Sequence, residues 1–381
     1  MRVVLSTLGK FHTFDLARQM QRHNALEAIF TGYPSFKLRN ERLPGQRIHT
    51  FPWLHAPYMK LGTRVEGARL WWEWQDRVWF DRHVSRRLPE CDIFCALSGA
   101  GLNSGRVARG RGAKYICDRG SSHIRYQDRI LREEYDRQGI AFGGIDPRII
   151  EREESEYDLA DLITVPSTFA MRSFIECGVS AKKLRLIPYG VDPSSFQATG
   201  RPNAATFEVL FVGSVSVRKG VRYLLEAFDR VSHPEKRLTL IGPVSPELKP
   251  TIAKIHRRTD VSVLGAIPQE RLKHYMSTSH VLVLPSIEEG LAMVQAQALA
   301  CGCPVISSMN TGAADLFTDG VEGFIVPVRD SEAIAGRLQA LAADPQLQAG
   351  MRAAALRRVE SLGGWNEYGD AAYRVYTEAL A

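Results

Sequence analysis

The stretch from Val281 to Ile306, VLVLPSIEEGLAMVQAQALACGCPVI, is the strongest constraint on how this chain can fold. Its first four residues, Val281–Leu284, are all apolar, which is typical of a strand buried on both faces of a parallel sheet. Residues 291–300 are rich in Ala, Leu, Met and Gln and predict a helix. Gly302 and Pro304 end this helix before a second apolar strand. A strand, a turn, a helix and a strand in this order indicate an open α/β sheet.

The turn within this unit, Glu288-Glu289-Gly290, has the features of a ligand site. It follows the carboxyl end of a buried strand and precedes a helix, which is where open α/β sheets bind their ligands. The first N–H groups of the helix can bind an anion, and the Glu289 carboxylate can accept hydrogen bonds from hydroxyl groups. We therefore expect this turn to bind a nucleotide-linked sugar.

The length of 381 residues predicts two domains, each with its own core. Predicted strands and helices alternate in both halves, which favours parallel, doubly wound sheets. Residues 189–205 contain Gly200 and Pro202 and read as a linker. We place an N-terminal domain at residues 1–192 and a C-terminal domain at residues 193–364. The six cysteines include no CxxC pair, so we expect a reducing cytoplasm and no metal site.

The net charge of +7 is concentrated in the N-terminal half. Residues 1–150 carry 25 Lys and Arg against 15 Asp and Glu, whereas residues 201–381 carry 19 of each. A basic surface can face anionic lipid, an acidic glycan or nucleic acid, and a solvated Arg-rich surface explains it equally well. Residues 58–88 predict one long helix or a broken pair of helices, with Trp72 and Trp79 on one face. We favour packing of this face on the sheet over contact with a membrane.

A second informative stretch is FVGSVSVRKG, residues 211–220. A predicted strand ends at Gly213, and Arg218 and Lys219 come just before the helix that begins near Gly220. Cations beside free helix N–H groups bind a diphosphate strongly. Solvated loop charges are the alternative, because basic loop residues are common. The stretch is not a P-loop, since GxxxxGK[ST] is absent.

A third stretch, the Gly-rich loop Ser98–Gly105, raises the alternative of a nicotinamide-dependent enzyme. It follows a predicted strand, and Asp118 ends the next strand at about the distance that a ribose-binding acid needs. Its third Gly is one residue late, and the loop does not lie on the first βαβ unit of the chain. A Gly-rich turn in any doubly wound sheet explains it without a cofactor.

Taken together, FVGSVSVRKG, LIPYGVDPSSF and SIEEGLAMVQAQALACGCPVI resemble the motifs of family 4 glycosyltransferases, most strongly over residues 160–326. The resemblance implies the GT-B fold, an α/β architecture of two facing Rossmann-like doubly wound domains. In this fold a C-terminal helix, here residues 365–381, crosses back to the N-terminal domain.

The resemblance also implies an activity. Members of the family transfer a sugar from a nucleotide-linked donor with retention at the anomeric carbon. The resemblance thus implies a hexosyltransferase-type enzyme that needs neither a metal ion nor a cofactor, with a UDP- or GDP-linked sugar as its donor. The acceptor would be a glycan or a lipid-linked molecule in the synthesis of cell-surface polysaccharides or glycoconjugates. We expect a cytoplasmic protein without a nucleic-acid partner. Peripheral contact between the basic N-terminal domain and the inner face of the membrane stays open.

Residue roles follow from the same resemblance. Glu289 matches the first Glu of the E-x7-E motif, which contacts the donor sugar, and His123 matches a His near that sugar. The expected catalytic residues are Glu289, Lys219 and His123. The expected diphosphate-binding residues are Gly213, Ser214, Arg218 and Lys219. The expected sugar- and nucleotide-binding residues are Gly9, Glu289, Gly290, Leu291, Ala292, Met293 and Gln297.

Two positions depart from the family pattern. Gln297 stands where the family has the second Glu of its motif, which holds the ribose hydroxyls, and Ser214 stands where the family often has Arg. A neutral amide accepts a weaker hydrogen bond than a carboxylate. Gln297 therefore keeps an inactive nucleotide-sugar-binding homologue as an alternative to a transferase. A nucleotide-sugar epimerase, which shares the GT-B fold, is a second alternative.

Overall fold

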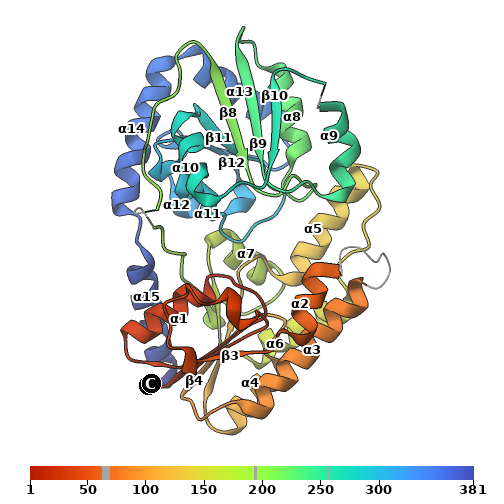
Figure 1. Ribbon diagram of the computed structural model, residues 1–381, viewed down its shortest axis with the longest axis vertical. Helices are drawn as coiled ribbons and strands as arrows, with labels where there is room; N and C mark the ends of the chain where they lie inside the picture. The colour runs from red at the N-terminus through yellow and green to blue at the C-terminus, as the bar shows by residue number, and fades with distance from the viewer. Residues whose placement is uncertain (62–68, 193–194, 256) are drawn as a thin grey trace.

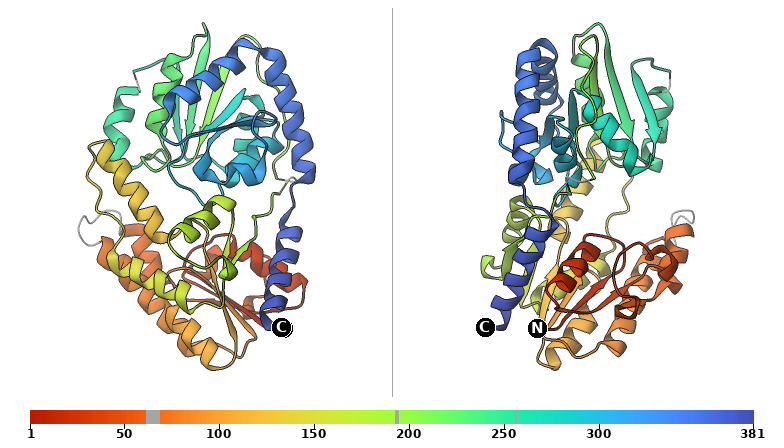
Figure 2. Two further views of the ribbon diagram at one scale, coloured as in Figure 1. Left: turned by 180° about the vertical axis from the view of Figure 1, so that it is seen from behind. Right: turned by 60° about the vertical axis from the view of Figure 1, so that its left-hand side comes forward.

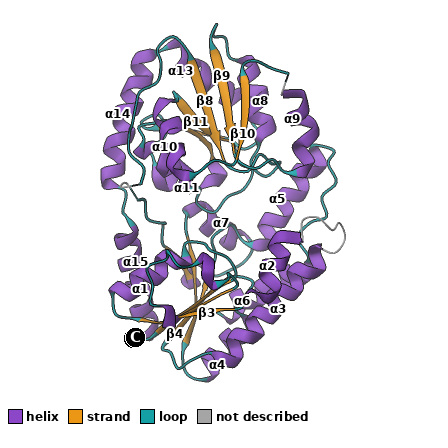
Figure 3. Ribbon diagram, viewed as in Figure 1, coloured by secondary structure: helices purple, strands orange, loops and turns teal. Residues whose placement is uncertain are grey.

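The computed structural model describes residues 1–61, 69–192, 195–255 and 257–381. It contains two parallel sheets, each with helices on both faces, and the two domains face each other across a central cleft (Figure 1). Figure 3 shows the strands inside each domain and the helices around them. The predicted GT-B fold is confirmed.

The N-terminal sheet has the strand order β3-β2-β1-β4-β5-β6-β7. Its strands are β1 (Val3–Thr7), β2 (Leu26–Thr31), β3 (Ile48–Thr50), β4 (Ile93–Leu97), β5 (Lys114–Asp118), β6 (Leu162–Val165) and β7 (Leu184–Leu186). Its helices are α1 (Thr13–Arg22), α2 (Pro52–Leu61), α3 (Arg69–Arg87), α4 (Leu102–Gly110), α5 (Ile124–Arg137), α6 (Pro147–Leu159) and α7 (Thr168–Glu176).

The C-terminal sheet has the strand order β10-β9-β8-β11-β12-β13. Its strands are β8 (Phe207–Val212), β9 (Lys236–Ile241), β10 (Val261–Gly265), β11 (Val281–Leu284), β12 (Val305–Ser308) and β13 (Gly323–Val326). The helices are α8 (Val221–Arg230), α9 (Lys249–Ile255), α10 (Gln269–Thr278), α11 (Met293–Ala300), α12 (Ala313–Leu316), α13 (Ser331–Ala343), α14 (Pro345–Ser361) and α15 (Trp365–Leu380).

The strand order reverses once in each sheet, between β1 and β4 and between β8 and β11. At such a point the loops from two neighbouring strands run in opposite directions, and a crevice lies between them. This crevice is the usual ligand site of open α/β sheets. All four residues of β11 are buried, as its unbroken apolar sequence predicts. The Glu288-Glu289-Gly290 turn after β11 and the Arg218-Lys219 loop after β8 therefore lie at the same crevice.

The last helix, α15, crosses from the C-terminal domain back to the N-terminal domain, as expected. Figure 2 shows it continuing from the end of α14 into the N-terminal domain, where it packs against α1. Its buried residues Tyr368, Ala372 and Tyr376 belong to the same apolar cluster as β1 and α1. At the start of the helix, Gly190 lies against the backbone of Gly364, where a Cβ would come within 2.4 Å of its carbonyl carbon.

Helix α5 belongs to the N-terminal half of the sequence but packs in both domains. Its residues Ile130 and Leu131 are part of the C-terminal apolar core. In the same helix, the buried carboxylate of Glu134 accepts hydrogen bonds from Tyr223 and Arg329 of the C-terminal domain. The helix thus joins the two domains (Figure 1).

Residues 58–88, predicted as one long helix or a broken pair, fall in two helices, α2 and α3, and residues 62–68 between them lie outside the described part of the chain. The predicted packed face is wrong at Trp79, which is 43% exposed. The face of α3 that turns inward instead carries Asp81, whose carboxylate accepts hydrogen bonds from the N–H groups of Asn103 and Ser104. Of the helices that the structure describes, none is long and apolar enough to cross a membrane.

We predict that Tyr376→Ala lowers the free energy of unfolding by about 3–5 kcal/mol, because it empties a fully buried aromatic site. Leu380→Ala, on the same helix at a side chain that is 41% exposed, is the matched control and should change it by less than about 1 kcal/mol. Urea denaturation measures both. Equal effects would show that α15 does not pack as described.

Candidate active site

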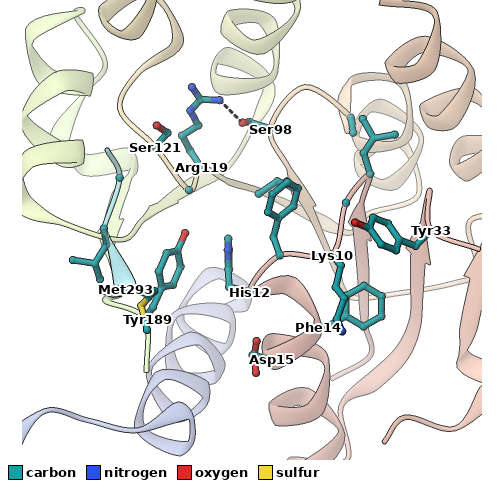
Figure 4. Close-up of a pocket in the computed structure, with 18 of the residues that line it drawn as sticks. Lys10, His12, Phe14, Asp15, Tyr33, Ser98, Arg119, Ser121, Tyr189 and Met293 are labelled. Atoms are coloured by element: carbon teal, nitrogen blue, oxygen red, sulfur yellow. Dashed lines mark hydrogen bonds between the residues drawn. The ribbon is translucent and has the colours of Figure 1, made fainter. Parts of the chain in front are cut away.

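The cleft between the domains has a volume of about 1280 Å³ and is lined by both of them. Residues Arg218, Glu289, Gly290, Leu291 and Met293 come from the C-terminal domain. The opposite wall includes Gly9, Lys10 and His12 after β1, and Arg119, Gly120 and Ser121 after β5. Figure 4 shows Met293 and Ser121 beside Tyr189 and His12 at this meeting of the two domains.

The structure brings together the two stretches that the sequence singled out. Lys219 forms an ion pair with Glu289. The glycine at position 220, which caps α8, makes this possible: its φ of +66° is left-handed, and a Cβ there would lie 2.0 Å from the carbonyl oxygen of Pro285. Because the loop before α8 packs directly on the end of β11, its cations reach the acidic turn.

The remaining residues expected at the donor side lie near the cleft but do not line it. Gly213 ends β8 and packs against Gly242, where a Cβ would come within 1.9 Å of the Gly213 carbonyl oxygen. Ser214 makes a hydrogen bond with Ser216. Ala292 is buried just before α11, and Gln297 lies half-buried one turn after Met293 in that helix.

The residue before Glu289 has a role that the sequence did not indicate. Glu288 is fully buried and belongs to the C-terminal domain, but most of its partners belong to the N-terminal domain. Its Oε1 accepts hydrogen bonds from the Ser121 Oγ at 2.6 Å and from the Oγ and N–H of Ser122 at 2.7 and 3.1 Å. Its Oε2 accepts from Gln127 Nε2 at 2.8 Å and from Arg218 Nε at 3.0 Å. This carboxylate joins the domains beside the cleft.

Burial raises the pKa of Glu288, but the Arg218 guanidinium and the hydrogen bonds from Ser121, Ser122 and Gln127 outweigh it and lower the pKa to about 2. The carboxylate is therefore ionised at neutral pH. Gln127 is itself oriented by Arg119, whose Nη2 donates to its Oε1 at 3.0 Å. Arg119 in turn pairs with the buried carboxylate of Glu153 at 2.6 Å.

His123 is not in the cleft, contrary to expectation. Its ring packs against Tyr157 and Phe174, and its Nδ1 accepts a hydrogen bond from the N–H of Arg125 at the start of α5. Burial lowers its pKa to about 4, so the imidazole is neutral at pH 7. It caps a helix and fills a core, and the cavity that it lines is a separate one of about 300 Å³.

The sequence analysis selected neither of the histidines that line the cleft, His55 and His12. His12 lies after β1 on the N-terminal wall. Its Nε2 lies 2.5 Å from Asp118 Oδ2, and its ring stacks on that of Tyr189 with centroids 4.3 Å apart. Asp118 also accepts a hydrogen bond from Thr164. The signal was present, because His12 follows β1 and Asp118 ends β5, two parallel strands whose carboxyl ends lie at one edge of the sheet.

In the Gly-rich loop after β4, four N–H groups donate to buried carboxylates and are therefore not available to a pyrophosphate. Glu156 accepts hydrogen bonds from the N–H groups of Gly99 and Gly101 at 2.6 and 2.9 Å. Asp81 accepts hydrogen bonds from the N–H groups of Asn103 and Ser104 at the start of α4. The acid that would bind the ribose, Asp118, is paired with His12. The structure thus argues against the nicotinamide alternative.

On the N-terminal side the cleft mixes paired charges with aromatic faces. Glu41 forms ion pairs with Lys10 and with Arg18, the latter at 2.9 Å. Phe11 is 55% exposed, and Gly9 lies directly against its ring. Two basic residues that line this side of the cleft, Lys10 and Arg18, are therefore paired with a carboxylate.

Comparison with known proteins identifies the C-terminal domain. Residues 196–358 match the model of the family described as "Glycosyl transferases group 1". This match covers the C-terminal domain, which is therefore similar to the group 1 glycosyl transferases. The matched residues include both the Arg218-Lys219 loop and the acidic turn.

Individual proteins similar to this chain are described as glycosyltransferases. The chain is 26% identical over 228 residues to the amylovoran biosynthesis glycosyltransferase AmsK of Erwinia amylovora, covering 55% of this chain and 56% of that protein. It is 30% identical over 227 residues to a D-inositol 3-phosphate glycosyltransferase of Xylanimonas cellulosilytica, covering 53% of each. The chain thus spans about half the length of the curated relatives it matches.

Solved structures share the fold over almost the whole chain. The sucrose-phosphate synthase of Thermosynechococcus elongatus superposes with a TM-score of 0.76 at 20% identity, covering 99% of this chain and 98% of that one. Anabaena Alr3699/HepE, solved in complex with UDP and glucose, superposes with a TM-score of 0.74 at 15% identity, covering 99% and 100%. These likenesses establish the GT-B fold.

We predict that Gly290→Ala forces the domains apart, because a Cβ at Gly290 would lie 2.0 Å from the carbonyl oxygen of Gly120 in the other domain. Small-angle X-ray scattering should show a larger radius of gyration. Gly336→Ala is the control: it lies within α13 with open space around its Cβ, and it should stabilise the fold by about 0.5–1 kcal/mol. An unchanged radius for Gly290→Ala would contradict the close approach.

The low pKa of Glu288 predicts a pH dependence. A carboxyl group whose pKa is depressed in the folded state contributes stability above its ordinary pKa of about 4.5, and this contribution is lost as the pH falls towards 2. Unfolding free energies measured between pH 5 and pH 2 should fall more steeply in the wild type than in Glu288→Gln. Parallel curves would show that the carboxylate is not held as described.

Proposed function

We propose that this protein transfers a sugar from a nucleoside-diphosphate sugar to a glycan or lipid-linked acceptor, with retention at the anomeric carbon and without a metal ion. The observation that carries the proposal is the Lys219–Glu289 ion pair at the crevice of the C-terminal sheet. It places a cation for phosphates beside a carboxylate for sugar hydroxyls.

The leaving group explains why cations are needed. When the bond between the anomeric carbon and the phosphate oxygen breaks, its electron pair goes to the diphosphate, whose negative charge grows. Lys219 and Arg218, beside the N-terminus of α8, can stabilise that charge. In a retaining reaction the acceptor hydroxyl attacks from the face that the diphosphate leaves and passes its proton to a phosphate oxygen.

The donor sugar and the acceptor would bind on opposite walls of the cleft. Glu289 and the backbone of Gly290, Leu291 and Met293 face the cleft where the donor sugar would lie. Across from them, the exposed ring of Phe11 and the paired charges around Glu41 suit a hydroxyl-rich acceptor better than a strongly charged one.

Two comparisons support the choice of donor and pathway. The Anabaena structures hold UDP or UDP-glucose, which favours a UDP-linked donor over a GDP-linked one. The Erwinia relative belongs to amylovoran biosynthesis, and a Salmonella typhimurium relative, 27% identical over 176 residues, is a putative colanic acid biosynthesis glycosyltransferase. Both names favour a role in polysaccharide synthesis.

Thermal-shift screening with UDP-, GDP- and ADP-sugars tests the donor, because a ligand that binds the folded state raises the melting temperature. We expect a UDP-sugar to stabilise the protein and NADH to have no effect. Transfer of labelled sugar from that donor to lipid and polysaccharide extracts, with and without EDTA, then tests the reaction and its metal independence.

We predict that Lys219→Ala and Glu289→Ala each lower the rate of transfer by about a hundredfold or more, as does loss of other charge-stabilising contacts. The exposed residues Lys254 and Glu332 provide control substitutions of the same kinds, which should leave the rate unchanged. Near-normal rates of transfer in both Lys219→Ala and Glu289→Ala would contradict the proposed donor site.

A further inference from the structure

We propose that Glu288 is a positioning residue that holds Arg218 ready for the donor diphosphate only while the two domains are closed. The inference rests on the proposed function and adds to it a link between domain closure and donor affinity. It starts from the hydrogen bonds that meet at this carboxylate.

Glu288 leaves one edge of the Arg218 guanidinium free. Nε and Nη2 of Arg218 both approach Glu288 Oε2, at 3.0 and 2.9 Å, and Nε also lies 3.1 Å from the Glu288 carbonyl oxygen. No described residue accepts a hydrogen bond from Nη1. Arg218 lines the cleft, so its free Nη1 edge is available to a phosphate oxygen there.

The carboxylate is in turn held by the N-terminal domain. Ser121, Ser122 and Gln127 supply four hydrogen bonds to its two oxygens. The series Glu153–Arg119–Gln127 orients the Gln127 amide, so that its NH₂ group points at Glu288. If the domains separated, all four bonds would break, and Glu288 would be free to move with Arg218.

A second buried carboxylate serves as a comparison. It distinguishes the positioning of Arg218 by Glu288 from the mere attachment of one domain to the other. Glu134 of α5 is also fully buried between the domains and accepts hydrogen bonds from Tyr223 at 2.9 Å and Arg329 at 2.6 Å. Its described hydrogen-bond partners are Gln138, Tyr223 and Arg329 and do not include Arg218, and it is not among the described residues that line the cleft. A role in domain attachment alone predicts the same effect from either carboxylate.

The test uses Glu288→Asp, which keeps the negative charge but shortens the side chain by one methylene. Glu288→Gln would be ambiguous, because removing a negative charge beside the diphosphate strengthens binding while the lost hydrogen bonds weaken it. Glu134→Asp is the matched control. The affinity for UDP and for GDP is measured by isothermal titration in the wild type, both single variants, Arg218→Ala and the double variant Glu288→Asp/Arg218→Ala.

We expect Glu288→Asp to weaken UDP binding about tenfold, the effect of losing one hydrogen bond to a charged group, and Glu134→Asp less than about twofold. In the Arg218→Ala background Glu288→Asp should have no further effect, because its action passes through Arg218. If circular dichroism shows that Glu288→Asp does not fold, Ser122→Ala takes its place. This substitution removes one hydrogen-bond donor and no charge, and it should weaken UDP binding a fewfold.

The outcomes distinguish the inference from the function on which it rests. Equal losses in Glu288→Asp and Glu134→Asp, or an undiminished loss in the Arg218→Ala background, would overturn the positioning role while leaving the donor site in place. Unchanged UDP affinity in Glu288→Asp would do the same. A wild-type protein that binds neither UDP nor GDP would instead refute the proposed function.

Discussion

One buried carboxylate, that of Glu288, determines how the two halves of the candidate site meet. It comes from the C-terminal domain, and the N-terminal domain surrounds it with hydrogen-bond donors. A buried charge is tolerated only when it is paired and hydrogen-bonded, so these contacts have to be satisfied together. The closed arrangement of the cleft, and the position of Arg218 within it, depend on them.

Close backbone contacts at glycines make this arrangement possible. Gly220 allows the cation loop to pack on the end of β11, and Gly290 allows the acidic turn to pack on Gly120 across the domain boundary. Side chains at either position would separate groups that have to meet. The charges therefore act on a frame that backbone packing has already fixed, which is how a site is preorganised for a developing charge.

Local patterns predicted the fold well because the strands are uninterrupted apolar runs and the helices have clear boundaries. Val281–Leu284 was predicted as a strand and is one, and the family resemblance implied the crossing of the last helix. Helix α14 was not predicted, although Asp344 and Pro345 are a clear start signal: the Asp344 carboxylate caps its first N–H groups. The interdomain partners of Glu288 lie about 165 positions away in the sequence, and no local pattern predicts such a contact. His123 was expected at the cleft from the family resemblance, whereas His12 and His55 are the histidines that line it.

The central claim is that a nucleoside diphosphate binds between the Arg218-Lys219 loop and the acidic turn. Hydrogen–deuterium exchange of the full chain with and without UDP tests it most directly, because bound ligand slows exchange at the amides it covers. We predict slower exchange at residues 213–220 and 286–293, with residues 120–127 following as the domains close. Protection confined to residues 98–105, or none at all, would contradict the claim.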